Sequence, residues 1–273
     1  MQQIQLILED SYKGYGHSQG LARGLQLFWD GENRTQEGMG LGTIAIKEDG
    51  CTYFSKNYRD FAEETKVSAR AFSLDTVLLT GPKGMESSLL TWLRDLGIAF
   101  YKKHPKTQAA QLSADRFLRR FFCIHRVFKT VRPKAEAVVN YDLGQNEVLL
   151  TFKTSIPEFG RPKICLMNEL GADWFDKGLM EGKVVPPPSA WQPLAKGKQS
   201  PLLYSTRLGL SFGISDIYVS DNLPYQLFWG REKTQELCWA GFILEIEVND
   251  PAISLVTCRY KIALSRPSDR ENE

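Results

Sequence analysis

The segment NELGADW, residues 168–174, carries side chains suited to sugar recognition. Asn168, Glu169 and Asp173 offer an amide and two carboxylates that can hydrogen-bond hydroxyl groups. Trp174 adds an aromatic face that can cover the apolar side of a pyranose ring. The same pattern is also typical of a turn, because Asn and Asp beside Gly are common turn residues and Trp is often a core residue. The segment therefore predicts a ligand site or a structural turn.

A histidine lies in the Gly-rich segment GYGHSQG, residues 14–20. An imidazole in such a loop can titrate near neutral pH and transfer protons. Acid–base catalysis on a bound ring needs one acid and one base with separated pKa values, and His17 and Glu169 are the residues that we assign to this pair. A Gly-rich loop also needs no function to exist, so a plain loop is the competing interpretation.

The tetrapeptide QLFW occurs twice, at residues 26–29 and 226–229, and TQE follows each copy a few residues later. This pattern predicts a repeated β-hairpin, with Trp29 and Trp229 as equivalent core or groove residues. Glu37 and Glu236 would act on a glycosidic bond only if they converge in the fold. In the competing structural interpretation, aromatic residues anchor paired strands and opposite charges pair across them. The candidate ligand residues of the two copies are Trp29, Glu37, Arg231 and Glu236, and Arg34 and Trp239 belong to the same segments.

The composition of the 273 residues, 42% hydrophobic and 24% charged, is typical of a soluble globular protein. A net charge of +2 is too small to indicate nucleic-acid binding.

The five cysteines are odd in number and form no CxxC pair, which argues against a disulfide framework and a zinc site and favours free thiols in a reducing cytoplasm. We expect no metal and no cofactor. No apolar run is long enough to span a membrane and no secretion signal is visible, so we expect a cytoplasmic protein.

Alternating apolar residues at both ends of the chain predict β-strands. The hairpin prediction is clearest at residues 135–155, where two alternating runs flank DLGQN. The stretch GKVVPPPSAWQPLAKGKQSP, residues 182–201, is rich in Pro and Gly and predicts a long surface loop. We expect one β domain over residues 1–264 and a disordered polar tail over residues 265–273.

The middle of the chain, about residues 85–130, changes to apolar spacings of three and four, which predict an insert of two amphipathic helices. Its segment RFLRRFFCIHRVFK, residues 116–129, mixes cations with aromatic residues. Such a segment could bind an anionic membrane surface or a phosphorylated partner. It could equally be a helix with its aromatic stripe on the core and its basic face in solvent.

The order of motifs VVNYDLGQNEVLLTF, MNELGADWF, LGLSFGISD and FWGREKTQELCWAGFILEIEV resembles the galactose mutarotase-like β-supersandwich family. The resemblance implies several stacked antiparallel sheets with a concave carbohydrate-binding face. It also implies a His general acid and a Glu general base. His104 and His125 lie in the predicted helices, so His17 is the histidine left in a β context.

The predicted fold is therefore mainly β, a large antiparallel multi-sheet supersandwich with a two-helix insert. The predicted function is binding or processing of a carbohydrate or a related polyhydroxylated ligand. The alternative is a non-enzymatic peripheral module that binds an anionic membrane or a phosphorylated partner through the basic insert.

Overall fold

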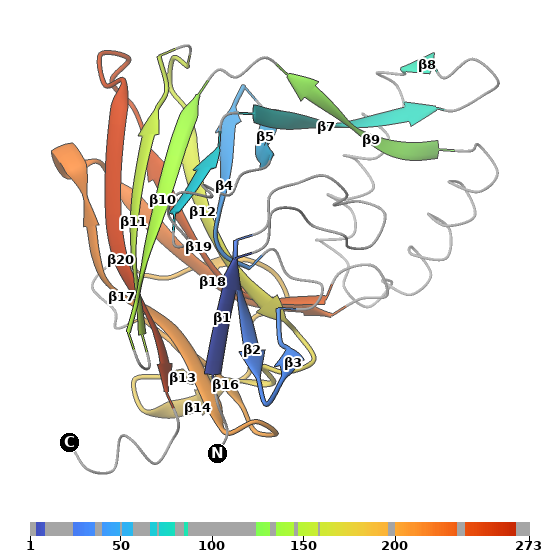
Figure 1. Cartoon of the computed structure of the whole chain (residues 1–273), viewed down its shortest axis with the longest axis vertical. Helices are drawn as coiled ribbons and strands as arrows, with labels where there is room; N and C mark the ends of the chain where they lie inside the picture. Colours follow the sequence, from blue (N-terminus) through green and yellow to red (C-terminus); the bar gives the residue numbers. More distant parts are fainter. Residues whose placement is uncertain are drawn as a thin grey trace. The chain divides into compact units, whose positions relative to one another are not determined.

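Figure 1 shows the computed structural model, and the chain forms two compact units. Residues 1–72 and 131–273 make up the first, called the sandwich unit here, and residues 73–130 make up the second. The structure describes residues 4–8, 24–35, 40–49, 51–56, 66–69, 71–79, 85–86, 124–131, 135–144, 147–157, 159–195, 200–233 and 238–265.

Sheet A of the sandwich unit is antiparallel throughout. Its strands run in the order β15 (Gln192–Pro193), β18 (Tyr225–Lys233), β19 (Cys238–Glu247), β12 (Lys163–Gly171), β4 (Gly40–Glu48) and β5 (Cys51–Lys56). Strand β2 (Leu25–Trp29) pairs with β4, and also with β1 (Ile4–Leu8) and β3 (Glu32–Asn33). Both QLFW copies therefore belong to one sheet, on either side of β12.

Sheet B is also antiparallel and has eight strands among the described residues. Their order is β14 (Lys183–Val185), β13 (Lys177–Met180), β16 (Leu202–Ser205), β17 (Leu210–Val219), β20 (Leu255–Ser265), β11 (Glu147–Ser155), β10 (Glu136–Leu143) and β6 (Lys66–Ala69). A short 3₁₀ turn, η2 (Ser220–Asn222), follows β17. The predicted hairpin is confirmed, because β10 pairs with β11 from Glu136↔Ser155 to Leu143↔Val148.

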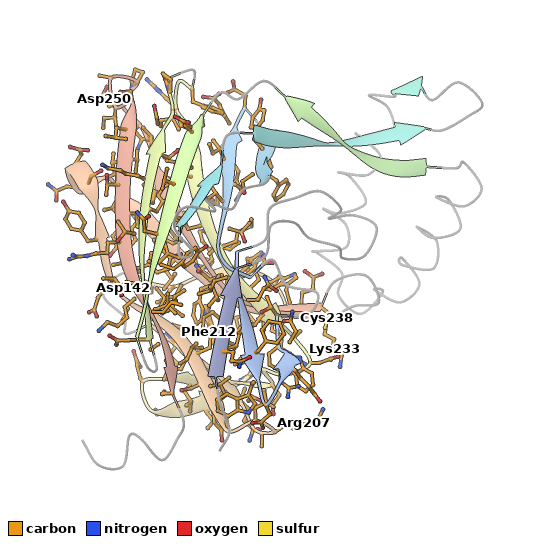
Figure 2. The ribbon with its side chains drawn as sticks, in the orientation of Figure 1. Asp142, Arg207, Phe212, Lys233, Cys238 and Asp250 are labelled. Atoms are coloured by element: carbon orange, nitrogen blue, oxygen red, sulfur yellow. The ribbon has the colours of Figure 1, made fainter. Side chains whose placement is uncertain are left out.

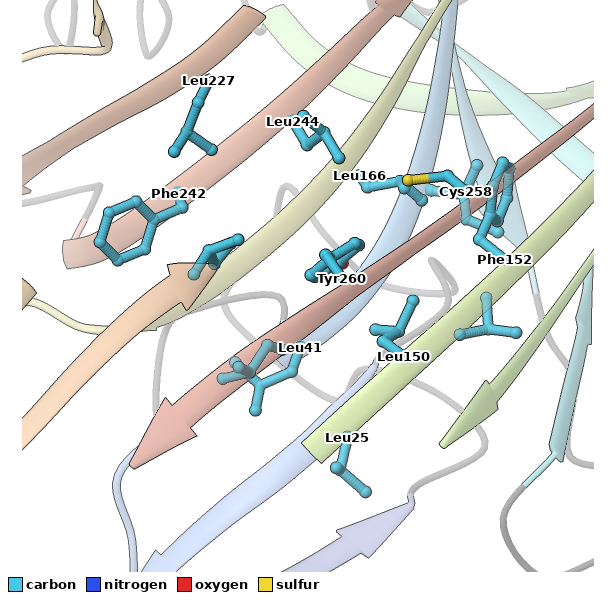
Figure 3. Packing of buried hydrophobic residues seen from close by; sticks show 14 of the residues in the cluster. Leu25, Leu41, Leu150, Phe152, Leu166, Leu227, Phe242, Leu244, Cys258 and Tyr260 are labelled. Atoms are coloured by element: carbon cyan, nitrogen blue, oxygen red, sulfur yellow. The ribbon is translucent and has the colours of Figure 1, made fainter. Parts of the chain in front are cut away.

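One hydrophobic core fills the space between the two sheets, and Figure 3 shows side chains that contribute to it. Val148, Leu150 and Phe152 alternate with more exposed residues along β11, as expected for a strand with one face in the core. Tyr260 of β20 donates a hydrogen bond across this core to Asn168 of β12, with an O···O distance of 3.0 Å. The expectation of a mainly antiparallel β protein is confirmed.

The two sheets differ on their outer faces. Strand β11 of sheet B alternates buried residues with exposed or half-buried ones, whereas the β12 residues from Ile164 to Gly171 are all buried. On the outer face of sheet A, Ala45, Cys165 and Met167 form a second, small hydrophobic cluster. Sheet A therefore buries both faces of its central strands.

The prediction of a two-helix insert is wrong at both ends of the insert, where the structure has strands. Met85–Glu86 is strand β8 and Ile124–Val131 is strand β9, and both pair with β7 (Ala71–Leu79). The run IHRVFKTV is rich in β-branched and aromatic residues, which favour an extended backbone, and it starts after the last helix-spaced apolar residue, Phe122. No α-helix occurs among the described residues, and residues 87–123, which hold most of the predicted insert, lie outside them.

The basic segment 116–129 is therefore not one continuous helix, because its last residues belong to β9. The predicted surface loop 182–201 contains two short strands, β14 and β15. Pro193 is tolerated in β15 because, among the described strands, β15 pairs on one side only, with β18. Of the predicted tail, Ser265 ends β20 and the remaining residues lie outside the described part. In the part of the chain that the structure describes, no helix is long and apolar enough to cross a membrane.

Candidate functional site

The segment NELGADW forms the end of β12 and the turn that follows it, and both repeat segments reach this turn. The backbone N–H of Gly171 donates to the carbonyl of Arg34, which follows the first QLFW copy (2.9 Å). From the second copy, Nε of Arg231 donates to the carbonyl of Ala172 (2.9 Å). The segment is thus both a turn and the place where the two copies meet.

Trp174 lies beside two guanidinium groups. The Cζ atom of Arg34 is 4.1 Å from the ring centroid and that of Arg207 is 4.9 Å away. Arg34 is buried, and its guanidinium is held by the carboxylate of Glu32 and by the carbonyl of Trp29 (Nη2···O 3.1 Å). Both pairs are cation–π contacts, which stabilise a cation most strongly where water is excluded.

Two charged residues of the turn have partners at the protein surface. Asp173 is exposed and forms an ion pair with Lys233, which belongs to the second repeat segment. Asp176 accepts hydrogen bonds from the backbone N–H and the hydroxyl of Thr206, both at 2.8 Å. Burial raises the pKa of the Asp176 carboxyl, but the hydrogen bonds from Thr206 outweigh it and lower that pKa below its ordinary value.

Glu169 lies on the outer face of sheet A. It is directly opposite Gly241 of β19, and the next outward position of β19 is Trp239, opposite Gly171. Trp239 stacks on Trp191 of the 182–201 segment, with ring centroids 3.7 Å apart and an interplanar angle of 9°. A buried carboxylate and a pair of parallel indole rings therefore lie on one sheet face. Glu169 and Trp239 are diagonal neighbours on adjacent strands, and residues in such positions are about 7–8 Å apart.

Asn168 points the other way, into the core, and has a structural role. Its Oδ1 accepts hydrogen bonds from the N–H of Gly42 and from the hydroxyl of Tyr260, both at 3.0 Å. Gly42 is the extra residue of a β-bulge between β4 and β12, and its φ of +82° favours glycine. The amide of Asn168 thus satisfies a buried N–H that the bulge removes from the strand ladder.

The two QLFW copies have the same alternation but different hairpins. Leu and Trp of both copies are in the main core, and Trp229 packs so closely on Gly178 that a Cβ there would lie 2.7 Å from its ring. After Trp29 the chain turns at once through Asp30 and Gly31, both with positive φ, as in a two-residue hairpin. After Trp229 the strand continues to Lys233. The structural interpretation of the tryptophans is confirmed, and within the described ranges the two copies do not form the same hairpin.

A charged cluster that sequence reasoning missed also lies on the outer face of sheet A. Glu245 accepts hydrogen bonds from Lys47 and Lys163, both at 3.1 Å, and the thiol of Cys165 is 3.7 Å away. Burial raises the pKa of Glu245, but the two lysines outweigh it and hold that pKa below its ordinary value. Burial raises the pKa of the Cys165 thiol to about 12, so this thiol is a poor nucleophile.

Three of the predicted site residues, His17, Glu37 and Glu236, lie outside the described residues. Of the others, Asp173, Trp174 and Arg231 meet at the β12 turn, Glu169 lies on the outer face, and Asn168 and Trp29 lie in the core. Arg207 and Trp191 were not predicted, because no local pattern marks them and their partners are distant in sequence. Within the described ranges, no group of three or more His, Cys, Asp or Glu residues could hold a metal ion.

No family model matches the chain, and no curated protein matches it in sequence. Among solved structures, heparinase III is similar at a TM-score of 0.43 and 8% identity, with 98% of this chain and 33% of that chain covered. The Slr1438 protein of Synechocystis sp. PCC 6803 is similar at a TM-score of 0.39 and 12% identity, over 97% of this chain and 93% of that one. A galactose mutarotase related enzyme of Lactobacillus acidophilus is similar at a TM-score of 0.27 and 9% identity, over 97% of each chain.

Proposed function

We propose that the protein binds a carbohydrate on the outer face of sheet A, at the end of β12. The observation that carries this proposal is the stacked pair Trp191 and Trp239 beside Glu169 on the same sheet face. An aromatic platform next to a carboxylate provides both surfaces that a sugar ring requires, one for its C–H groups and one for its hydroxyls.

The two tryptophans have different roles in this site. Trp239 is 7% exposed and is fixed in the sheet, whereas Trp191 is half-buried and retains contact with solvent. Trp191 is also held in place, because the adjacent residues Gln192 and Pro193 form β15 against β18. A ring whose orientation is set before the ligand arrives loses little conformational entropy on binding.

Glu169 has the position of a hydroxyl acceptor or of a catalytic base. It is 8% exposed and comes from the central strand of the sheet, so its backbone is firmly placed. A catalytic version of this proposal pairs Glu169 with His17 as the proton donor. Binding requires only the carboxylate and the indole pair.

The test is a binding screen of neutral and acidic oligosaccharides, with isothermal titration calorimetry on the full chain and on Trp191→Ala. We expect the variant to bind a sugar hit about tenfold more weakly, because it loses the solvent-facing ring of the stack. Glu169→Gln is expected to weaken the same hit while it keeps the shape of the side chain. A bound sugar also raises the unfolding temperature by mass action.

The matched control is Tyr218→Ala, which removes an aromatic side chain that is 56% exposed on β17 of sheet B. Its affinity for the sugar is expected to equal that of the unchanged protein. Equal affinities of Trp191→Ala and the unchanged protein, or a screen with no binding sugar, would overturn the proposal.

A further inference from the structure

We propose that the carbohydrate ligand is acidic, and that Arg207, with Arg34 and Trp174, forms a subsite for the carboxylate of a uronic acid. This inference rests on the proposed function, and it names the chemical class of the sugar. The subsite lies at the turn that follows β12. Its Trp174 comes three residues after Gly171, and Gly171 is the cross-strand partner of Trp239.

Arg207 is presented by a rigid turn. It lies between β16 and β17, and the carboxylate of Asp176 accepts both hydrogen bonds from the preceding residue, Thr206. On the other side, the backbone N–H of Leu208 donates to the hydroxyl of Ser205 (3.1 Å). The side chain of Arg207 takes part in neither contact and lies over the ring of Trp174 instead.

Three described carboxylates near the turn are engaged by other groups. Glu32 pairs with Arg34, Asp173 pairs with Lys233, and Asp176 is bound by Thr206. Among the described residues, the one partner that the structure gives to the exposed guanidinium of Arg207 is the ring of Trp174. Its hydrogen-bond donors are therefore available to a ligand.

The charges at Trp174 do not balance. Counting only the described residues, Arg34 and Arg207 bring two positive charges to one indole ring and Glu32 supplies one negative charge, so one positive charge remains. Arg34 is 4% exposed, and its Nε has no hydrogen-bond partner in the described part of the chain. Because Glu32 offsets the charge of Arg34, the uncompensated charge is that of Arg207, whose exposed guanidinium a ligand anion can reach.

A carboxylate fits this arrangement better than a neutral hydroxyl does. The guanidinium is planar and can donate two parallel hydrogen bonds to the two oxygens of a carboxylate. Figure 2 shows Arg207 and Lys233 toward one end of the sandwich unit, with Asp250 at the opposite end. The cationic subsite and the indole pair both adjoin the same end of β12, so an oligosaccharide could contact both.

The experiment compares each acidic oligosaccharide of the screen with its own methyl ester, which keeps the ring and removes the charge. We expect the free acid to bind the unchanged protein about tenfold more tightly than the ester, as for a charge-assisted hydrogen bond. Arg207→Gln is expected to bind acid and ester equally and to keep the affinity for the ester. Arg207→Lys keeps the charge without the planar fork, so we expect an intermediate ratio.

Arg259→Gln is the matched control, because Arg259 is an exposed arginine on β20 of sheet B. This variant removes the same charge as Arg207→Gln does. Its ratio of affinities for the free acid and the methyl ester is expected to equal that of the unchanged protein. The unfolding temperature of each variant shows whether it is folded. Equal binding of acid and ester by the unchanged protein, or a preference that persists in Arg207→Gln, overturns this inference and leaves the proposed function intact. If neither form of any sugar binds, both proposals fail.

Discussion

The outer faces of the two sheets have opposite characters. On sheet B, buried residues of β20 such as Cys258 and Tyr260 alternate with exposed or half-exposed ones such as Arg259 and Lys261. On sheet A, β12 is buried on both faces, and its outer side carries Cys165, Met167 and Glu169. An antiparallel sheet commonly leaves one face to solvent, as sheet B does. The difference is that the outer face of sheet A is covered at its centre, whereas that of sheet B is not.

Glycines in the two sheets are also packed against different kinds of neighbour. In sheet A, Gly241 lies against the backbone of β12, and a Cβ there would be 2.0 Å from the carbonyl oxygen of Asn168. In sheet B, a Cβ on Gly213 would meet the end of a side chain, Cδ2 of Leu202, at 2.3 Å. A leucine methyl group can move, whereas the backbone of a central strand cannot.

The largest predicted effect is therefore that of Gly241→Ala. We expect it to lower the free energy of unfolding by about 3 kcal/mol, because the added methyl group forces β12 and β19 apart. Gly213→Ala is expected to cost about 1 kcal/mol, since Leu202 can change its rotamer. Urea unfolding of the two variants measures both values. Equal losses would show that the two sheets are packed with the same tolerance.

The next effect concerns the hydrogen bonds that join the sheets. Asn168→Ala leaves two buried donors without an acceptor, the N–H of Gly42 and the hydroxyl of Tyr260. We expect a loss of about 2–3 kcal/mol in the free energy of unfolding. Tyr260→Phe removes only one of these bonds and is expected to cost about 1 kcal/mol. A loss in Asn168→Ala that is no larger than that in Tyr260→Phe would contradict the structural role of Asn168.

Local sequence patterns predicted the main strands of the sandwich unit and a turn after β12, but not the short strands β14 and β15 or strand β9. Alternating residues identified the 135–155 hairpin, and the Gly and Asp of NELGADW indicated a turn. They did not reveal that Asn168 faces the core while Glu169 faces outward. That distinction depends on the strand register and on the bulge at Gly42, which is set by a partner strand more than 100 residues away.

The candidate site shows the same limit. Trp174 was predicted as a ligand residue from its local segment, but its neighbours Arg34 and Arg207 adjoin strands of two different sheets. Trp191 lies in a Pro-rich segment whose composition indicates a loop and says nothing of a stacking partner. In the predicted insert, helix-spaced residues suggested helices through Thr130, whereas pairing with β7 makes residues 124–131 a strand. In each case the deciding contact is long-range.

The smallest predicted effect compares a partly buried ion pair of sheet A with an exposed one of sheet B. The pKa of Glu245 is lowered from its ordinary value of 4.5, so its interactions with Lys47 and Lys163 stabilise the fold above that pH. This contribution is lost as the pH falls below about 4.5 through the lower pKa of the folded state. Glu245→Gln is expected to cost about 1 kcal/mol at neutral pH, because both lysines are nearly half exposed, and to reduce the acid sensitivity of unfolding.

Glu147→Gln is the counterpart on sheet B, where Glu147 pairs with Lys261 and its side chain is 52% exposed, against 11% for Glu245. Solvent screens this pair, so we expect no measurable change in stability and the same pH profile as the unchanged protein. Thermal melts from pH 3 to pH 8 on both variants provide the comparison. If Glu245→Gln lost no more stability than Glu147→Gln at neutral pH, the outer face of sheet A would be as well hydrated as that of sheet B. The contrast between the two sheets would then lie in packing alone.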